Sequence, residues 1–387
     1  MPRMLRNFVA VMKILLMGDY SNCHRTLATG LRRLGHDVTV ASNGSRWMDT
    51  ARDIDLSRPS DSKLGGLRLW MRLRGRLRNR LEGYDVVSIN NPVMVEQRPE
   101  RCMALFDRLR KSNGAVFLTC MGSDTNFIKA CIDPSGPLPV NEWMINGEPA
   151  PLYRSNPAKV DQWLNPSLTR LTDHIYRNIA GATTILYEYE RVAALHLPPE
   201  KRAYISLPID VKAMEPVYIP DMPQKVRFFL GRHQGRLVEK GTDLLEHAAR
   251  AVVERYPDAV ELVIVENRPY NEYLELLKSA HVVLDQIYSY TPATNALLAM
   301  AYGLTAVSGG EPEFYDFIGE RDNRPVINAQ PDYEALVSTL EQTVLDRRTL
   351  AARGRASREF VEKHNDVDMV AHRAVDFWTS RINTDRS

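Results

Sequence analysis

Residues 225–245 read KVRFFLGRHQGRLVEKGTDLL, and this stretch decides the kind of fold. An apolar run ends at Gly231, a loop with cations follows, and helix-forming residues begin at Thr242. Such apolar runs return at VELVIVE (260–266), HVVLDQI (281–287) and LTAVSG (304–309), with helical patterns at 242–255, 271–279 and 294–302 between them. Strands that alternate with helices form a parallel sheet covered on both faces. The C-terminal half is therefore predicted to be a doubly wound α/β domain.

The same alternation runs through the N-terminal half. MKILLMG (12–18) predicts a strand, a helical pattern follows, and DVTVAS (37–42) predicts the next strand. The remaining strands are predicted at 84–90, 115–124, 183–188 and 203–208, and the helices at 99–111 and within 167–180. We divide the chain into an N-terminal domain at 12–210, a C-terminal domain at 211–365, and a last helix at 366–387 that returns to the N-terminal domain. Residues 1–11 are interpreted as an extension.

Composition and charge exclude several classes of protein. The 387 residues, 44% hydrophobic and 25% charged, are typical of two globular domains. A net charge of +2 gives no general reason to expect a nucleic acid partner. The four cysteines form no Cys-x-x-Cys pair, so reduced thiols and a cytoplasmic location are expected. No apolar run approaches the roughly 20 residues that cross a bilayer.

Residues 133–166 interrupt the alternation with a polar, proline-rich stretch that is too long for an ordinary connection. This insertion carries Trp143, Tyr153 and Trp163. The three aromatic side chains either form a platform for a substrate or fasten the insertion to the surface of the domain. The second interpretation is the simpler one.

The stretch LRLWMRLRGRLRNRL at 67–81 is predicted to be a helix. Trp70, Leu73, Leu77 and Leu81 would share one stripe, with six arginines around it. This pattern fits a helix that lies on a membrane surface. It also fits a domain helix whose apolar stripe faces the core and whose arginines face water. Peripheral membrane contact through 67–81 therefore remains one of two interpretations.

Candidate ligand-binding residues follow the apolar runs, because ligands bind beyond the carboxyl ends of the strands in open parallel sheets. Arg232 and Lys240 supply the cations that a diphosphate needs, since arginine can grip two oxygens and lysine is a mobile point charge. Glu266 and Asn267 follow the next strand and could bind a base or a ribose. Backbone N–H groups at 292–295 would bind an anion at the start of a helix.

Two loops in the N-terminal half are further candidates. GDYSN (18–22) lacks the G-x-G-x-x-G pattern, which argues against a nicotinamide-dependent enzyme. It is either a substrate loop that begins at Gly18 or an ordinary turn before a helix. MGSD (121–124) places Asp124 at the end of a strand, where its side chain either meets a polar ligand or caps the next helix.

The order of these motifs resembles the GT-B glycosyltransferases, in particular the large retaining family that includes sucrose-phosphate and mannosyl transferases (family 4, group 1). The most specific similarity lies between residues 228 and 320. The similar stretches are GR at 231–232, KG at 240–241, the strand ending at Glu266, ALLAMAYG (296–303), VSGGEPEF (307–314) and, at the other end of the chain, MKILLMG (12–18) and RRLGHDVTVAS (32–42).

The resemblance implies two Rossmann-like domains that face each other across a cleft. It implies transfer of a sugar, with retention, from a nucleotide-diphospho-sugar to a glycan or lipid-linked acceptor, such as a cell-envelope polysaccharide. No metal and no further cofactor are expected, because Arg232 and Lys240 would clamp the diphosphate. Asp124 or Glu311 would orient the acceptor hydroxyl or the donor sugar. The donor-binding residues would be Gly18, Glu266, Asn267, Tyr290, Thr291, Pro292, Ala293, Thr294, Asn295 and Glu311.

The chain departs from the family at one motif. Family members usually carry two glutamates separated by seven residues, and these positions hold Tyr290 and Leu298 here. The usual ribose and donor-sugar contacts are therefore missing, and Glu311 and Glu313 are candidate replacements. Two alternatives stay open: a sugar-nucleotide epimerase with the same architecture, and a non-catalytic GT-B protein that acts as a binding or scaffold subunit. The base, the sugar and the acceptor also stay open.

Overall fold

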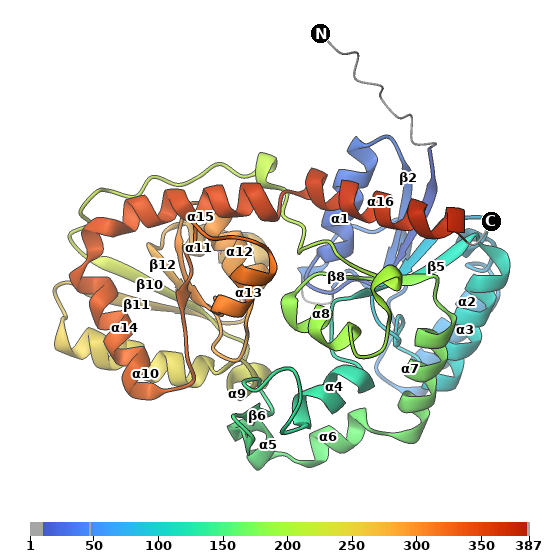
Figure 1. Ribbon diagram of the computed structural model, residues 1–387, viewed down its shortest axis with the longest axis horizontal. Helices are drawn as coiled ribbons and strands as arrows, with labels where there is room; N and C mark the ends of the chain where they lie inside the picture. Colours follow the sequence, from blue (N-terminus) through green and yellow to red (C-terminus); the bar gives the residue numbers. More distant parts are fainter. Residues whose placement is uncertain (1–10, 46–47, 385–387) are drawn as a thin grey trace, which may run out of the picture.

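Two parallel sheets, one in each half of the chain, form the framework of the molecule (Figure 1). The computed structural model describes residues 11–45 and 48–384. The extension predicted at 1–11 lies outside the described residues, apart from Val11.

The N-terminal half contains a seven-stranded sheet in the order β3-β2-β1-β4-β5-β8-β9, and every neighbouring pair is parallel. The chain starts in the middle at β1, builds outward to β3, and returns to β4 on the other side of β1. The strands are β1 (Lys13–Met17), β2 (Asp37–Ser42), β3 (Ile54–Asp55), β4 (Val86–Ile89), β5 (Ala115–Cys120), β8 (Gly181–Thr184) and β9 (Arg202–Tyr204).

Helices cover both faces of this sheet, because successive side chains of a strand point to opposite faces. Ile14 and Leu16 of β1 pack in one core cluster, whereas Leu15 and Met17 pack in another. The first cluster includes residues of α1 and α16, and the second includes residues of α2 and α3. The helices of this half are α1 (Cys23–Arg33), α2 (Lys63–Arg74), α3 (Pro99–Ser112), α4 (Thr125–Ile132), α7 (Pro166–Asn178) and α8 (Tyr187–Ala193).

The C-terminal half contains a five-stranded parallel sheet in the order β11-β10-β12-β13-β14. The strands are β10 (Val226–Gly231), β11 (Val260–Val265), β12 (Val282–Leu284), β13 (Thr305–Ser308) and β14 (Ile327–Asn328). The helices are α9 (Leu237–Lys240), α10 (Thr242–Arg255), α11 (Tyr270–Lys278), α12 (Thr294–Ala301), α13 (Pro312–Phe317), α14 (Tyr333–Leu345) and α15 (Leu350–His364). The predicted fold class, two doubly wound α/β units, is confirmed.

The last helix, α16 (Val367–Thr384), packs on the N-terminal half (Figure 1). A Cβ atom on Gly30 of α1 would lie 2.9 Å from Cβ of Ala371, so the two helices touch where Gly30 has no side chain. Trp378 is fully buried, and its ring lies 6.0 Å from that of Phe117 in β5. The final helix therefore contributes to the core of the half in which the chain begins.

Several predicted strands are shorter than expected. The one predicted at 115–124 ends at Cys120, and the one at 281–287 covers only Val282–Leu284. The strand predicted at 183–188 ends at Thr184, and α8 begins at Tyr187 with Glu188 and Glu190 in its first turn, where acidic residues are favoured. The strand predicted at 203–208 ends at Tyr204. Ser206 has a left-handed φ of 73°, which lies outside the β region of backbone conformations.

The insertion at 133–166 has structure of its own: the hairpin β6 (Met144–Ile145) and β7 (Glu148–Pro149), followed by α5 (Pro151–Ser155) and α6 (Ala158–Trp163). Trp143 is 2% exposed, and Tyr153 and Trp163 pack against the same core. The aromatic side chains therefore fasten the insertion to the domain, as the simpler interpretation has it.

The single helix predicted over 67–81 is wrong. Helix α2 begins earlier, at Lys63, and ends at Arg74, because Gly75 leaves the helical conformation, for which glycine has a low propensity. A separate 3₁₀ turn covers Asn79–Leu81. The side chains that face the core are Leu69, Leu73, Leu77 and Leu81, whereas Trp70 is half-buried. The other 3₁₀ turns are Pro199–Lys201, Val211–Ala213, Gln234–Arg236 and Arg347–Thr349.

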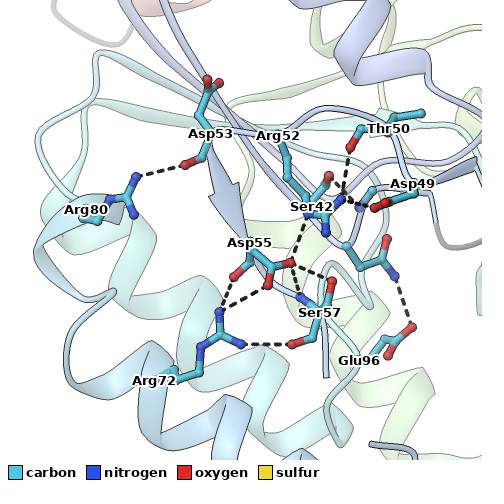
Figure 2. A network of polar contacts seen from close by, with 12 residues as sticks. Ser42, Asp49, Thr50, Arg52, Asp53, Asp55, Ser57, Arg72, Arg80 and Glu96 are labelled. Atoms are coloured by element: carbon cyan, nitrogen blue, oxygen red, sulfur yellow. Dashed lines mark hydrogen bonds and ion pairs between the residues drawn. The ribbon is translucent and has the colours of Figure 1, made fainter. Parts of the chain in front are cut away.

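Several arginines of this segment bind protein groups, as Figure 2 shows. Arg72 donates to the carbonyl oxygens of Asp55 (2.6 Å) and Ser57 (3.1 Å), and Arg80 donates to that of Asp53 (3.0 Å). These bonds hold the segment after β2 against the end of α2. The side of 67–81 that carries the buried leucines therefore packs against the core of the N-terminal half. No helix in the described part of the chain is long and apolar enough to cross a membrane.

Candidate functional site

Most of the candidate residues lie at one edge of the C-terminal sheet. Arg232 directly follows β10, and Glu266 with Asn267 directly follow β11. Because all five strands are parallel, their carboxyl ends meet at this edge. Lys240 ends α9, and 290–293 lead into α12. The fold thus gathers groups from Arg232 to Ala293 that are distant in the chain.

Arg232 is bound by two carboxylates. It forms ion pairs with Glu266, which lies at the same edge of the sheet, and with Glu246 of α10. The second oxygen of Glu266 accepts from the Gln234 amide at 3.4 Å. Two carboxylates therefore offset the charge of Arg232 and engage its Nε and Nη1, which leaves Nη2 as the part of the guanidinium that could reach a phosphate. The sequence did not indicate Glu246, because nothing in its spacing marks it as a partner of Arg232.

Lys240 is held by a buried carboxylate. Its Nζ lies 3.5 Å from Oδ1 of Asp285, which is 1% exposed. Asp285 also accepts from Nδ2 of Asn295 at 3.3 Å and from Oγ of Ser308 at 3.2 Å. Gly241 has a φ of 68°, and a Cβ atom there would lie 2.3 Å from Ile287. Glycine therefore lets the loop with Lys240 lie directly against the loop that follows β12.

The start of α12 has unused hydrogen-bond donors. Among the described residues, no acceptor lies opposite the backbone N–H groups of Thr294, Asn295 and Ala296, and no side chain caps the helix. The side chain of Asn295 is fixed by Tyr273, whose hydroxyl donates to Oδ1 at 2.5 Å. Free N–H groups at a helix start, together with the helix dipole, attract an anion. Lys240 shares Asp285 with Asn295, so a cation lies beside these donors.

Two N–H groups just before α12, unlike those at its start, already have protein partners. The N–H groups of Tyr290 and Thr291 bind the carboxylate of Glu188, at 2.6 and 3.0 Å, and Pro292 has no N–H group. The Tyr290 hydroxyl accepts from the N–H of Val140 at 3.2 Å. Of the stretch 290–295, the structure therefore leaves Ala293, Thr294 and Asn295 as the residues whose N–H groups can meet a ligand.

The Gly18 loop of the N-terminal half uses its donors internally. The N–H groups of His24 and Arg25, at the start of α1, bind the carboxylate of Asp19, and that of Cys23 binds the Tyr20 carbonyl. Burial raises the pKa of Asp19 to about 7. The loop thus carries its own acidic group at the place where a phosphate would otherwise bind a helix start.

Asp124 is a helix cap. One oxygen accepts from the N–H of Phe127 at 2.8 Å, and the other accepts from the Tyr176 hydroxyl at 3.0 Å. The carboxyl is buried, which raises its pKa. Both oxygens therefore have protein donors, and the capping interpretation of MGSD (121–124) agrees with the structure.

Glu311 lies beside the position of the first missing glutamate. Its N–H donates to the carbonyl of Tyr290 at 3.1 Å, and its side chain accepts from Gln330 at 2.5 Å. Leu298, at the second position, packs against the core of the C-terminal half. A carboxylate is thus present near Tyr290, the first of the two positions.

Groups from both halves meet in front of α12. Cys23, at the start of α1, lies beside the side chain of Thr294. Glu142 of the insertion lies within electrostatic range of Glu188 in one half and of Arg236 and Glu239 in the other. Burial and the nearby glutamates raise the pKa of Glu142 to about 7. Lys159 also reaches Glu239, at 3.0 Å. Sequence reasoning missed Glu142 and Glu188, since only the folding of the insertion and of α8 brings them here.

No model of a protein family matches the chain, and no curated protein sequence matches it. Solved structures do match. Sucrose-phosphate synthase from Thermosynechococcus elongatus superposes with a TM-score of 0.63 at 13% identity, covering 97% of this chain and 100% of that chain. The protein has the GT-B fold.

Other GT-B structures are similar over the same length. HepE from Anabaena, in complex with UDP and glucose, has a TM-score of 0.55 at 12% identity and covers 95% of this chain and 100% of its own. A candidate UDP-N-acetylglucosamine 2-epimerase from Listeria monocytogenes has a TM-score of 0.54 at 12% identity, with 94% of each chain covered. At these identities the similarity establishes the GT-B fold alone.

Proposed function

We propose that this GT-B protein transfers a sugar from a nucleoside-diphosphate sugar to a hydroxyl acceptor. The observation that carries the proposal is the start of α12, where the free N–H groups of Thr294, Asn295 and Ala296 lie next to Lys240 at the carboxyl edge of a parallel sheet. This is the arrangement that binds a phosphate group. The structure of HepE holds UDP and glucose, which supports the same ligand class here.

The chemistry needs stabilisation of the departing diphosphate. As the bond between the sugar and the diphosphate breaks, negative charge grows on the phosphate oxygens. Lys240 and the N–H groups of α12 are fixed donors that would stabilise this charge where it develops. Arg232 would add a second, weaker cation, because Glu246 and Glu266 offset its charge. Glu311, beside Tyr290, is the carboxylate placed to accept from a donor hydroxyl.

Nucleotide binding is the first expected result. UDP and UDP-sugars should raise the melting temperature by several degrees, because a ligand at 100 times its Kd stabilises the folded state by about 2.7 kcal/mol. Differential scanning fluorimetry across nucleoside diphosphates and their sugars measures the shift and identifies the base. Uridine without phosphate is the control and should give a much smaller shift. The absence of a shift with every nucleoside diphosphate would contradict the proposal.

Epimerisation of a sugar nucleotide is the second candidate activity, favoured by the structural similarity to a candidate epimerase. Incubation with UDP-N-acetylglucosamine and no acceptor separates the two. An epimerase would form a new sugar nucleotide that NMR detects, whereas a transferase would leave the substrate unchanged or hydrolyse it slowly. A protein that binds UDP but turns over neither with nor without acceptors would be a binding subunit.

A lipid-linked acceptor is the finer part of the proposal, and the outer face of α2 supports it. Leu64, Leu67 and Met71 are 53%, 41% and 56% exposed, and their spacing places them on one side of the helix. Arg68 and Arg76 line the surface around Met71. An exposed apolar stripe with arginines beside it is suited to an anionic membrane surface.

Sedimentation with vesicles of phosphatidylserine and phosphatidylcholine tests this surface. The protein should bind at low salt and release at high salt, because each basic residue near the surface contributes about 1 kcal/mol that salt screens. The double change Leu67→Ser and Met71→Ser should abolish sedimentation. Leu195→Ser, at a residue 58% exposed elsewhere, is the matched control and should behave like the wild type. If neither high salt nor the double change Leu67→Ser and Met71→Ser lowers binding to the vesicles, this surface is ruled out.

A further inference from the structure

Glu188 joins the two halves of the molecule, because both oxygens of its carboxylate accept hydrogen bonds from the other half. It lies in the first turn of α8, on the N-terminal half, and is 7% exposed. Oε1 accepts from the N–H groups of Tyr290 (2.6 Å) and Thr291 (3.0 Å), and Oε2 accepts from the Thr291 hydroxyl (2.7 Å). All three donors belong to the loop before α12 in the C-terminal half. None of the proposed chemistry uses this carboxylate.

The bonds form a closed set around Thr291. Its hydroxyl donates to Glu188 and accepts from the N–H of Tyr187 at 3.2 Å, while the rings of Tyr187 and Tyr290 lie 5.7 Å apart. Burying a carboxylate is costly unless hydrogen bonds replace its water. Here the replacement donors come from the other half of the chain. The buried state of Glu188 is therefore favourable only while the two halves are in contact.

The loop that Glu188 holds also carries the proposed phosphate site. Thr294, whose free N–H begins that site, is three residues beyond Thr291. Asp285, which holds Lys240, lies five residues before Tyr290 on the same connection between β12 and α12. A loop of this length has few ways to move once Tyr290 and Thr291 are fixed. The position of the donors at the start of α12 thus depends on Glu188.

We infer that Glu188 is a positioning residue, which places the phosphate-binding start of α12 and makes that placement depend on contact between the two halves. The inference rests on the proposed function for the identity of the ligand. Glu188 touches no substrate in this arrangement; it acts through the N–H groups of Tyr290 and Thr291. The phosphate site is accordingly complete only while Glu188 of the N-terminal half is bonded to Tyr290 and Thr291 of the C-terminal half.

Binding of UDP, measured by isothermal titration, tests the positioning. Glu188→Ala should weaken UDP at least tenfold, and Thr291→Val, which removes one of the three donors, should weaken it less. Glu188→Gln keeps an oxygen that accepts from both N–H groups and should stay within about threefold of the wild type. Glu200→Ala, at an exposed glutamate of the same half, is the control. Wild-type affinity in Glu188→Ala would overturn the inference.

The distance between the halves tests the dependence on contact. The four native cysteines are buried, so spin labels can be placed selectively at Lys111→Cys and Glu254→Cys, which are exposed in α3 and α10. Double electron–electron resonance should give a narrow distribution for the wild type and a broader, longer one for Glu188→Ala. An unchanged distribution would overturn the coupling. Failure of the wild type to bind UDP would instead refute the proposed function, and the distances would still decide whether Glu188 joins the halves.

Discussion

Replacing Lys240 with alanine is expected to weaken the binding of UDP about 10- to 100-fold. The lost interaction is a charge-assisted hydrogen bond to the diphosphate, worth roughly 1.5 to 3 kcal/mol. The melting temperature should change little, because Asp285 keeps its bonds from Asn295 and Ser308. Isothermal titration with UDP measures the affinity.

Two further variants make this result specific. Arg232→Ala should weaken UDP less than Lys240→Ala, because Glu246 and Glu266 already balance the charge of Arg232. Lys225→Ala, at an exposed lysine just before β10, should leave the affinity unchanged. Unaltered affinity in Lys240→Ala would remove Lys240 from the site, and a larger loss in Arg232→Ala would show that Arg232, and not Lys240, is the main cation for the diphosphate.

Trp378→Ala is expected to destabilise the fold by about 3 to 5 kcal/mol, the usual cost of removing a fully buried large aromatic side chain. Trp378 has no exposed surface and packs on Phe117 in the first sheet. Its loss should loosen α16 from the N-terminal half. Urea unfolding followed by circular dichroism measures the change, with a lower midpoint expected.

The matched control is Trp70→Ala in α2. Trp70 is half-buried and lies beside Arg74 and Arg101, whose guanidinium carbons are 6.0 and 5.5 Å from the ring centre. Its loss should cost markedly less than that of Trp378, because part of the side chain already faces water. Equal losses in the two variants would contradict the anchoring role of Trp378.

The strands and helices were predictable wherever an apolar run stood between polar loops. β1, β10 and β11 lie where the runs at 12–18, 225–231 and 260–266 placed them, because the strands of a sheet covered by helices are mostly apolar. The predictions were wrong where an apolar run continued past the end of a strand. The run at 183–188 contains a strand end and a helix start, and only backbone geometry separates them.

The candidate site was predictable only in part. Arg232, Glu266 and Asn267 could be chosen because they directly follow strands, and the start of α12 because a polar loop precedes it. Glu246, Asp285 and Glu188 were missed as partners. Each of them acts on a residue that is distant in sequence: Glu246 on Arg232, Asp285 on Lys240, and Glu188 on Thr291.

The sequence by itself determined the alternation of strands and helices, the parallel sheets and the edge at which a ligand would bind. These follow from local pattern, since side-chain periodicity and apolar length act over a few residues. Only the tertiary structure decided which charged groups and N–H donors of the described residues have protein partners and which are left without one. It paired Arg232 with two carboxylates, closed the Gly18 loop on Asp19, and left the N–H groups of α12 open. Hydrogen bonds and ion pairs depend on distances in space, and the folding of both halves sets those distances.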